Sequence, residues 1–323
     1  MDKTYATTLI ASLEEISDEI PVVQFDSLKD AANSEANVLE IAMPRSADKY
    51  GDDLLDALKE KKVIAIGYGA AQLFGHLGLE IKGGACAHFG GQVSKVVIKP
   101  NYFLKVDPDQ PAIAPYSEPS PGDNFGVYAP VKSNLAYATD VIVRMEKSPA
   151  YAPLIRQGNY ILSGLSGHPK TWSDDYRGLF QTVALTLMKS KSVPFGSLRR
   201  EATPPGEIQL SLDKASQKEG LPSQEFYFRF SKPTRFSAQV SHSGSSSVML
   251  LFMGEKDRLH WTRLDAKKGE PLTITVQITE EDLEKIGDVH WTLKVTNFDR
   301  NNGAECRLEI NYDPSAMEKA KDN

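Results

Sequence analysis

The residues best placed to do chemistry surround a sharp turn at Gly67-Tyr68-Gly69. The turn follows an apolar run, Val63 to Ile66, and precedes a segment of helical character, Ala70 to Leu77. Many α/β hydrolytic folds hold a Cys or Ser nucleophile at the apex of such a strand, turn and helix. Here the apex is Gly67, which has no side chain, so the turn lacks a nucleophile. Free backbone amides at the start of a helix can still hold a carboxylate or phosphate.

Three other side chains could supply chemistry beside this turn: Cys86, His88 and His168. Cys86 and His88 lie two residues apart in a glycine-rich stretch, and a thiol beside an imidazole can be activated. On an extended strand, positions i and i+2 share a face without hydrogen-bonding well, so a structural Cys86 is the simpler interpretation. His168 follows a second short apolar run, in Gly167-His168-Pro169-Lys170.

Metal and nucleotide sites find less support in the sequence. A metal could draw on His88, His168 and the pair Asp174-Asp175, but paired Asp residues before a helix are more often caps. No Cys-x-x-Cys or His-Glu-x-x-His motif occurs, so we predict neither a metal nor a cofactor. A dinucleotide site is disfavoured because the third glycine of Gly-x-Gly-x-x-Gly is missing after Gly69.

Strand and helix patterns alternate through residues 1–196. Strands are expected at 37–43, 63–66, 140–145 and 158–164, and helices at 7–16, 52–60, 70–77 and 176–189. This alternation predicts an α/β domain with a doubly wound, flavodoxin-like sheet. Residues 82–135 interrupt it with short strand patterns and many prolines and glycines, so we expect a β-rich excursion over one edge of the sheet.

The apolar period changes from 3.6 to 2 after a linker at residues 197–206. About eight alternating segments follow, as in Phe226 to Phe230 and Leu272 to Ile278. Each has one apolar face, so residues 207–314 are predicted to form an antiparallel, jelly-roll-like β-sandwich. The polar residues 315–323 are predicted to be a frayed tail.

Two segments of the first domain resemble class I glutamine amidotransferase-like domains. Lys62 to Phe74 is similar to the family's strand, Gly-Ile-Cys-x-Gly-x-Gln turn and helix. Gly167-His168-Pro169-Lys170, followed by Arg177-Gly178-Leu179-Phe180, is similar to its late His-Pro-Glu and the next helix. The resemblance covers residues 5–192 and implies the flavodoxin-like fold of that family.

The departures from the family's catalytic residues decide what this resemblance implies. The family's Cys falls on Gly67, its His on His168, and its Glu on Lys170. A Cys-His-Glu relay cannot operate with Gly and Lys in place of Cys and Glu. The resemblance therefore implies a degenerate scaffold that does not hydrolyse glutamine, which favours a protein without catalytic activity but leaves another reaction open. Its expected ligand site consists of Gly67, Tyr68, Gly69, Ala70, His168 and Trp172.

A second resemblance concerns residues 290–298 and 304–312, which look like the end of pre-peptidase C-terminal domains. Those domains are accessory sandwiches on secreted enzymes. The resemblance favours an extracellular or periplasmic location if a leader was removed. Without a removed leader, a cytoplasmic location is expected.

Charge and composition narrow the partners. The net charge of -6 argues against a nucleic-acid binder, and no run of eighteen apolar residues predicts a membrane span. The main hypothesis is a non-catalytic ligand-binding or assembly protein for a small molecule, glycan or protein. A hydrolase or transferase with a rearranged Cys86, His88 and His168 site is one alternative, and a carbohydrate- or protein-binding sandwich is another. The sequence leaves open whether the protein forms an oligomer.

Overall fold

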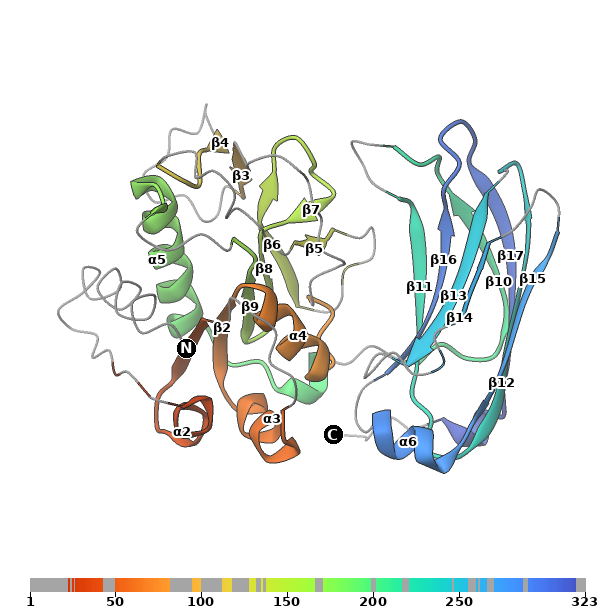
Figure 1. The fold of residues 1–323 in the computed structure, drawn as a ribbon, viewed down its shortest axis with the longest axis horizontal. Coiled ribbons are helices and arrows are strands. Elements are labelled where there is room, and N and C mark those ends of the chain that lie inside the picture. Colours follow the sequence, from red (N-terminus) through yellow and green to blue (C-terminus); the bar gives the residue numbers. More distant parts are fainter. Residues whose placement is uncertain are drawn as a thin grey trace. The chain divides into compact units, whose positions relative to one another are not determined.

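The computed structural model divides into two compact units, Met1–Arg199 and Arg200–Asn323 (Figure 1). The residues that the structure describes are 23, 25, 27–42, 50–81, 95–99, 112–117, 128–131, 135, 138–165, 171–198, 202–216, 221–245, 247–254, 260, 262–265, 270–286 and 290–317.

A seven-stranded mixed sheet in the order β1-β2-β9-β8-β6-β3-β4 forms the centre of the first unit. Only β1, β2 and β9 run parallel, and every other neighbouring pair is antiparallel. The strands are β1 (Val38–Ala42), β2 (Lys62–Ile66), β3 (Val96–Ile98), β4 (Ala112–Ile113), β6 (Thr139–Met145), β8 (Leu154–Gln157) and β9 (Tyr160–Ser163). The short strands β5 (Ala129–Pro130) and β7 (Tyr151–Ala152) pair with each other.

The α/β class is confirmed, whereas a flavodoxin-like, doubly wound sheet is not. One reason is a tight hairpin at Gly158 and Asn159, which joins β8 to β9. Gly158 has φ +55, and a Cβ there would clash with the Leu198 side chain. The sequence pattern over 158–164 suggested a single strand. That strand is confirmed as β9, but Gly158 and Asn159 at its start form a turn after β8, which was not predicted, so β8 and β9 are antiparallel.

Helices cover both faces of the sheet in the first unit. They are α2 (Leu28–Asn33), α3 (Asp52–Lys59), α4 (Tyr68–His76), α5 (Asp174–Lys189) and the 3-10 helix η3 (Phe195–Leu198). Ile64 and Ile66 of β2 share a core with α5, whereas Val63 and Ala65 share a core with α3 and α4. Burial on both faces explains why Val63 to Ile66 of β2 are all apolar.

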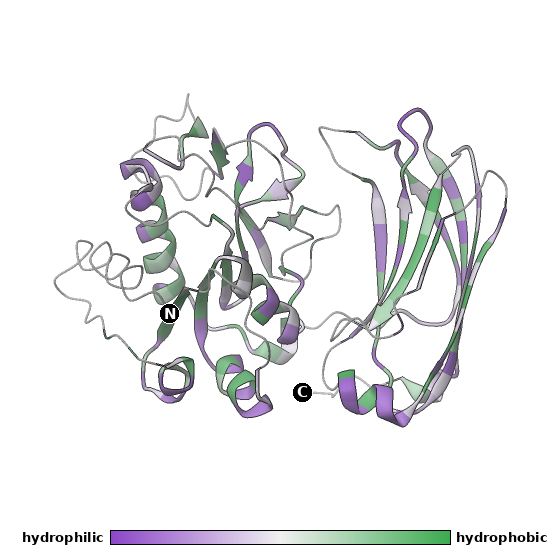
Figure 2. Cartoon of the chain, in the orientation of Figure 1, coloured by the Kyte–Doolittle hydropathy of each residue, from purple (hydrophilic) through white to green (hydrophobic). Residues whose placement is uncertain are grey.

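Helix α5 is fixed at both of its ends. The Ser173 hydroxyl accepts a hydrogen bond from the Tyr176 amide at 3.1 Å, which caps the start of the helix. The Lys62 ammonium donates to the carbonyls of Met188 and Ser190 at 2.9 and 2.7 Å, which satisfies the helix end. Hydrophilic and hydrophobic residues both occur along α5, as its amphipathic pattern predicts (Figure 2).

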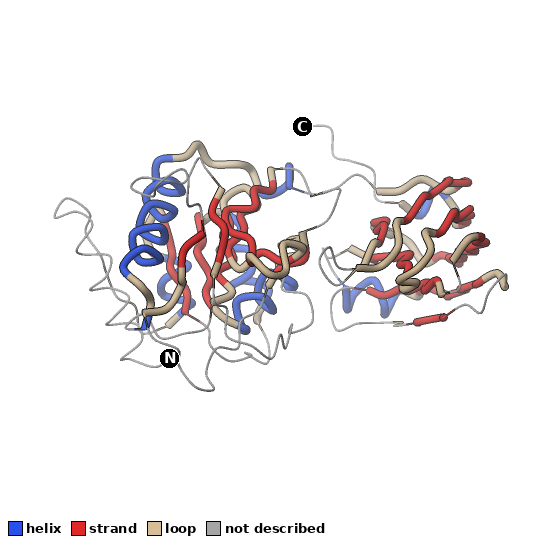
Figure 3. The backbone as a smooth tube through the Cα atoms, turned by 90° about the horizontal axis from the view of Figure 1, so that it is seen from above, coloured by secondary structure: helices blue, strands red, loops and turns tan. Residues whose placement is uncertain are grey.

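Two four-stranded antiparallel sheets form the second unit, in the orders β10-β17-β12-β15 and β11-β16-β13-β14 (Figure 3). All eight predicted strand segments are confirmed. They are β10 (Gly206–Leu212), β11 (Ser223–Phe228), β12 (Thr234–Ser243), β13 (Val248–Gly254), β14 (Thr262–Asp265), β15 (Leu272–Ile278), β16 (Trp291–Asn297) and β17 (Ala304–Asn311). Inner-face residues of both sheets belong to one hydrophobic core, which makes this unit a β-sandwich.

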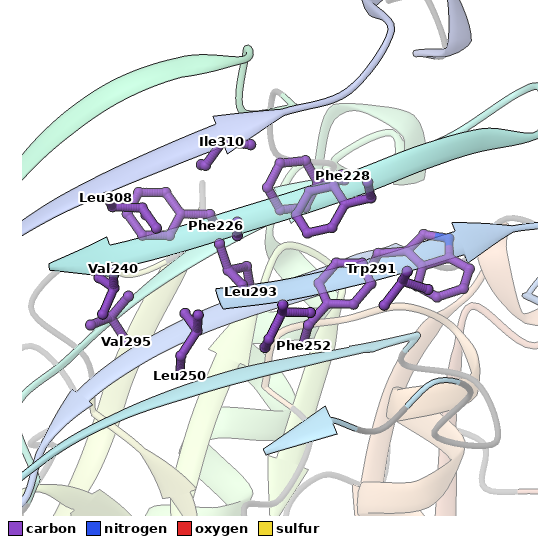
Figure 4. Close-up of a cluster of buried hydrophobic side chains, with 14 of the residues drawn as sticks. Phe226, Phe228, Val240, Leu250, Phe252, Trp291, Leu293, Val295, Leu308 and Ile310 are labelled. Atoms are coloured by element: carbon purple, nitrogen blue, oxygen red, sulfur yellow. The ribbon is translucent and has the colours of Figure 1, made fainter. Parts of the chain in front are cut away.

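Aromatic rings pack among aliphatic side chains in the core of the sandwich (Figure 4). Phe236 of β12 stacks on Phe252 of β13, with ring centroids 4.3 Å apart. Phe252 in turn stacks on Trp291 of β16 at 5.5 Å. These three rings are essentially inaccessible to solvent and link the two sheets directly.

Two elements of the sandwich unit were not predicted. Helix α6 (Glu280–Ile286) follows β15, and its Ile286 side chain packs so close to Gly254 that a larger residue there would require this side chain to shift. The 3-10 helix η4 (Pro314–Ala316) lies within the segment that was expected to be a tail. Ala316 is buried, and Met317 forms a β-bridge with Phe230, so this part of the segment is tied to the sandwich.

Candidate functional site

The glycine turn lies between β2 and α4, as the sequence predicts. Gly67 is buried and has φ +93 and ψ -171, a conformation that is open essentially to glycine alone. It is the N-cap of α4, and no side chain caps that helix. Its own amide donates to the Ser163 carbonyl at 2.9 Å, which ties the turn to the end of β9.

Backbone amides are the polar groups that this turn offers. The first N–H groups of an α-helix have no partner inside the helix, and in α4 these belong to Tyr68, Gly69 and Ala70. The helix dipole adds partial positive charge at the same point. β2 and β9 are parallel and both end here, with Ile66 opposite Ser163. In open α/β sheets ligands bind beyond the carboxyl ends of the strands.

Aromatic and hydroxyl side chains gather beneath the end of β9. Ser163 is fully buried, and its Oγ lies 3.4 Å from the Tyr176 hydroxyl. The Trp172 ring lies 5.2 Å from the Tyr176 ring and 5.1 Å from that of Phe180. Trp172 has no exposed surface and pairs with Tyr116 through a β-bridge. Its evident role is therefore to fix the segment that follows β9.

Tyr128 is a further buried hydroxyl of the first unit. Burial raises its pKa above the usual range, and the nearby Tyr116 adds to the shift. The Tyr128 hydroxyl therefore stays neutral at physiological pH.

Several predicted site residues lie outside the described part of the chain: Cys86, His88, His168 and Lys170. The structure thus places Gly67 to Ala70 and Trp172 and leaves the proposed Cys-His site as a prediction. Asp174 pairs with Arg177 at 2.8 Å in the first turn of α5, where Ser173 provides the cap. Within the described ranges, no three His, Cys, Asp or Glu residues are grouped to hold a metal.

A polar cluster around Asp282, in the sandwich unit, was not predicted from the sequence. His260 Nε2 lies 2.8 Å from Asp282 Oδ2, and the same oxygen accepts from the amide and hydroxyl of Thr279 at 2.9 and 2.8 Å. The Asp282 amide donates back to the Thr279 hydroxyl at 3.2 Å, which makes a reciprocal capping box for α6. Thr279-x-x-Asp282 was the signal for it. The His260 contact could not be predicted from the sequence.

Replacing Asp282 should test this cluster through its pH dependence. Burial alone would raise the pKa of Asp282, but hydrogen bonds from Thr279 and His260 outweigh it and hold the pKa below its usual value. The carboxylate therefore stabilises the fold above the unfolded-state pKa of about 3.9 and ceases to do so as pH falls through the lowered folded value. We expect Asp282→Ala to lower the free energy of unfolding by about 1–2 kcal/mol at pH 7.

Chemical unfolding at pH 7 and below pH 3 would measure this difference. The difference in the free energy of unfolding between Asp282→Ala and the unmodified protein should become smaller at the lower pH. Glu284→Ala, at an exposed position of the same helix, is the matched control and should change little at either pH. A gap that stays constant would show that the carboxylate charge is irrelevant.

The search against protein-family models gave no match, and no curated protein matches the chain. Solved structures with a similar part include the pre-peptidase C-terminal domain of collagenase from Bacillus anthracis, 11% identical, which covers 35% of this chain and 99% of its own at TM-score 0.23. Carbohydrate-binding module CBM36 in complex with calcium and xylotriose is 12% identical and covers 35% of this chain and 92% of its own at TM-score 0.20. A CBM4 structure is 12% identical and covers 35% of this chain and 84% of its own at TM-score 0.22.

At such identities and TM-scores these likenesses carry no argument about ligand or activity. They are consistent with the β-sandwich that the strands of the second unit already establish. They give no support to a glutamine amidotransferase-like domain. No helix in the described ranges is long and apolar enough to span a membrane.

Proposed function

We propose that this protein is a non-catalytic ligand-binding or assembly protein, which holds an anionic group of its ligand at the turn between β2 and α4. The observation that carries the proposal is Gly67 itself. It adopts a backbone conformation that suits glycine alone and is the N-cap of α4, yet it offers neither a nucleophile nor a side-chain cap. A turn of this kind can bind but cannot form a covalent intermediate.

The chemistry of the turn favours a carboxylate or a phosphate as the group that is held. Gly67 donates its amide to Ser163, whereas the amides of Tyr68, Gly69 and Ala70 have no backbone acceptor among the described residues, so these three are the amides that a ligand would use. Oriented N–H groups at a helix N-terminus attract negative charge. His168 of the second predicted motif is the candidate for a further contact, on the resemblance of its sequence alone.

Two substitutions at one position separate the backbone from the side chain. Tyr68→Pro removes a single N–H at the first helical position, where proline is well tolerated, and Tyr68→Ala keeps that N–H. We expect inorganic phosphate or L-glutamate to bind the Tyr68→Ala protein and to bind the Tyr68→Pro protein about tenfold more weakly, since a hydrogen bond to a charged group contributes about 1.5–3 kcal/mol. Calorimetric titration of the full chain measures both. Equal affinities would contradict the proposed site.

The outer face of the β10-β17-β12-β15 sheet supports a second candidate function, the binding of a glycan or protein through the sandwich. On this face the side chains of β17 alternate between buried and exposed. Exposed Arg307 lies between Gln209 and Ser241, and exposed Glu309 lies opposite Gln239. Such polar rows can form many hydrogen bonds with sugar hydroxyls. The strand order of the two sheets is compatible with a jelly roll, a fold that also occurs in lectin domains.

A glycan array with the full chain tests the second candidate. If the face binds sugars, Arg307→Ala should lose about tenfold in affinity for the bound glycan, as expected for one charged hydrogen bond. Arg235→Ala, at an exposed position nearer one end of the same face, is the control. If Arg307→Ala binds the glycan with unchanged affinity, the sugar binds elsewhere. If no glycan on the array binds the full chain, this hypothesis is wrong.

A further inference from the structure

An imidazole and a thiol face each other inside the sandwich. His242 of β12 and Cys306 of β17 are direct cross-strand partners. Each belongs to the face of its strand that points into the core, with Val240 and Leu308 as their apolar neighbours along that face. Cys306 is 2% exposed and forms no disulfide. The pair is separate from the turn at Gly67 and has no part in the proposed function.

The imidazole of His242 is an anomaly that requires an explanation. Both of its ring nitrogens are shielded from solvent, and neither has a hydrogen-bond partner within the described ranges. A buried polar group without a partner costs about 1–3 kcal/mol, and histidine has two such atoms here. Native structures rarely leave such groups unsatisfied unless a water, an ion or a reaction requires them.

The neighbouring thiol indicates which ligand would satisfy the ring. Directly opposed residues on antiparallel strands have Cβ atoms about 4.5–5.5 Å apart. A metal with bonds of about 2.3 Å to sulfur and about 2.0 Å to nitrogen spans two ligand atoms up to about 4.3 Å apart. The spacing of the two strands is therefore suited to an ion held between the sulfur and a ring nitrogen.

The number of ligands selects the class of metal. A structural zinc site takes four ligands, and no third His, Cys, Asp or Glu joins the pair in the described part of the chain. Thiolate and imidazole together suit soft Cu(I), which accepts two ligands. We propose that His242 and Cys306 form a two-ligand site for Cu(I) inside the sandwich.

Binding at this pair requires the thiol to lose its proton. Burial raises the pKa of Cys306 to about 11, and the adjacent Glu305, on the opposite face of β17, adds to the shift. The third strand partner, Leu210, carries no charge. One proton therefore passes to solvent as the copper–sulfur bond forms, while a neutral His242 nitrogen donates its lone pair. No electron is transferred, and affinity rises with pH.

Competition with the chromophoric chelator bicinchoninate measures Cu(I) affinity under anaerobic, reducing conditions. The experiment uses the full chain with Cys86→Ser, so that Cys306 is its sole thiol. We expect one Cu(I) per chain, and at least a hundredfold loss of affinity in His242→Phe and in Cys306→Ala. His290→Phe, which removes a buried histidine elsewhere in the sandwich, should bind as tightly as the parent. Absence of binding, or affinity unchanged by His242→Phe, would overturn the proposal.

X-ray absorption at the copper edge keeps the test decisive if a variant fails to fold. The loaded parent chain should show one sulfur and one nitrogen neighbour. Two sulfur neighbours would indicate a copper bridging two chains, and nitrogen or oxygen neighbours alone would indicate an ion on the surface. Either result would overturn the site.

Discussion

Phe180→Ala is expected to destabilise the first unit by about 3–5 kcal/mol, because it removes a large ring from a close-packed core. Phe180 is 2% exposed and lies on α5, with its ring 5.1 Å from that of Trp172. It belongs to the same core as Ile64 and Ile66 of β2. The loss should therefore loosen α5 and the strand that leads into the glycine turn.

Hydrogen exchange followed by mass spectrometry can show whether the destabilisation is limited to the first unit. Peptides from α5 and β2 should exchange faster in Phe180→Ala, while peptides from β12 and β17 should not change. Phe180→Leu, which keeps most of the apolar volume, should cost less than about 1.5 kcal/mol. Equal protection of α5 in Phe180→Ala and the parent would contradict the assigned core. A single unfolding midpoint is a weaker measure, since two units need not unfold together.

Phe236→Ala should have a comparable effect in the sandwich, again about 3–5 kcal/mol. Phe236 has no exposed surface, stacks on Phe252 at 4.3 Å and meets the edge of Phe228 at 4.9 Å. It projects from one sheet, whereas Phe228 and Phe252 project from the other. The substitution therefore opens a cavity between the two sheets.

The neighbouring Arg235 provides the matched control for this prediction. It is exposed on the same strand, one residue away, so Arg235→Ala should change the free energy of unfolding by no more than about 0.5 kcal/mol. Guanidinium unfolding followed by circular dichroism, with exchange of β12 and β17 peptides as the local measure, compares the two. Similar small effects of both substitutions would mean that the aromatic core contributes little.

The strands of the sandwich could be predicted because their apolar period of 2 is set by burial of one face. Leu272 to Ile278 alternates without exception between buried and exposed positions, and the structure shows the same alternation. The order of the strands could not be predicted, because the alternation of apolar and polar residues within a strand carries no information about its neighbours in the sheet. Helix α6 was missed because its seven residues are mostly charged, so its signal lay in the capping box alone.

The first unit was harder to predict from the sequence. β1, β2, α3 and α5 were predicted close to their observed bounds, because their apolar patterns are long and regular. The hairpin between β8 and β9 was not, since the expected strand began at Gly158 and no strand was expected at residues 154–157. Gly158 has a positive φ, as a two-residue turn with Asn159 requires. This turn makes β8 and β9 antiparallel neighbours.

The candidate site was predictable only where it depends on local backbone. The strand, Gly67 and helix α4 follow directly from the sequence, because a glycine between two apolar segments indicates a sharp turn. The tie from the Gly67 amide to Ser163, nearly a hundred residues later, depends on strand pairing and could not be predicted. The same holds for the contact of His260 with Asp282.

One measurement tests most directly the claim that the turn at Gly67 binds and does not catalyse. Release of ammonia from L-glutamine, and of p-nitrophenol from its acetate ester, is followed for the full chain and for His168→Ala. Our account predicts the same rate for both proteins, no higher than for buffer with an unrelated protein. Turnover by the unmodified chain that disappears in His168→Ala, while the fold is retained, would contradict it.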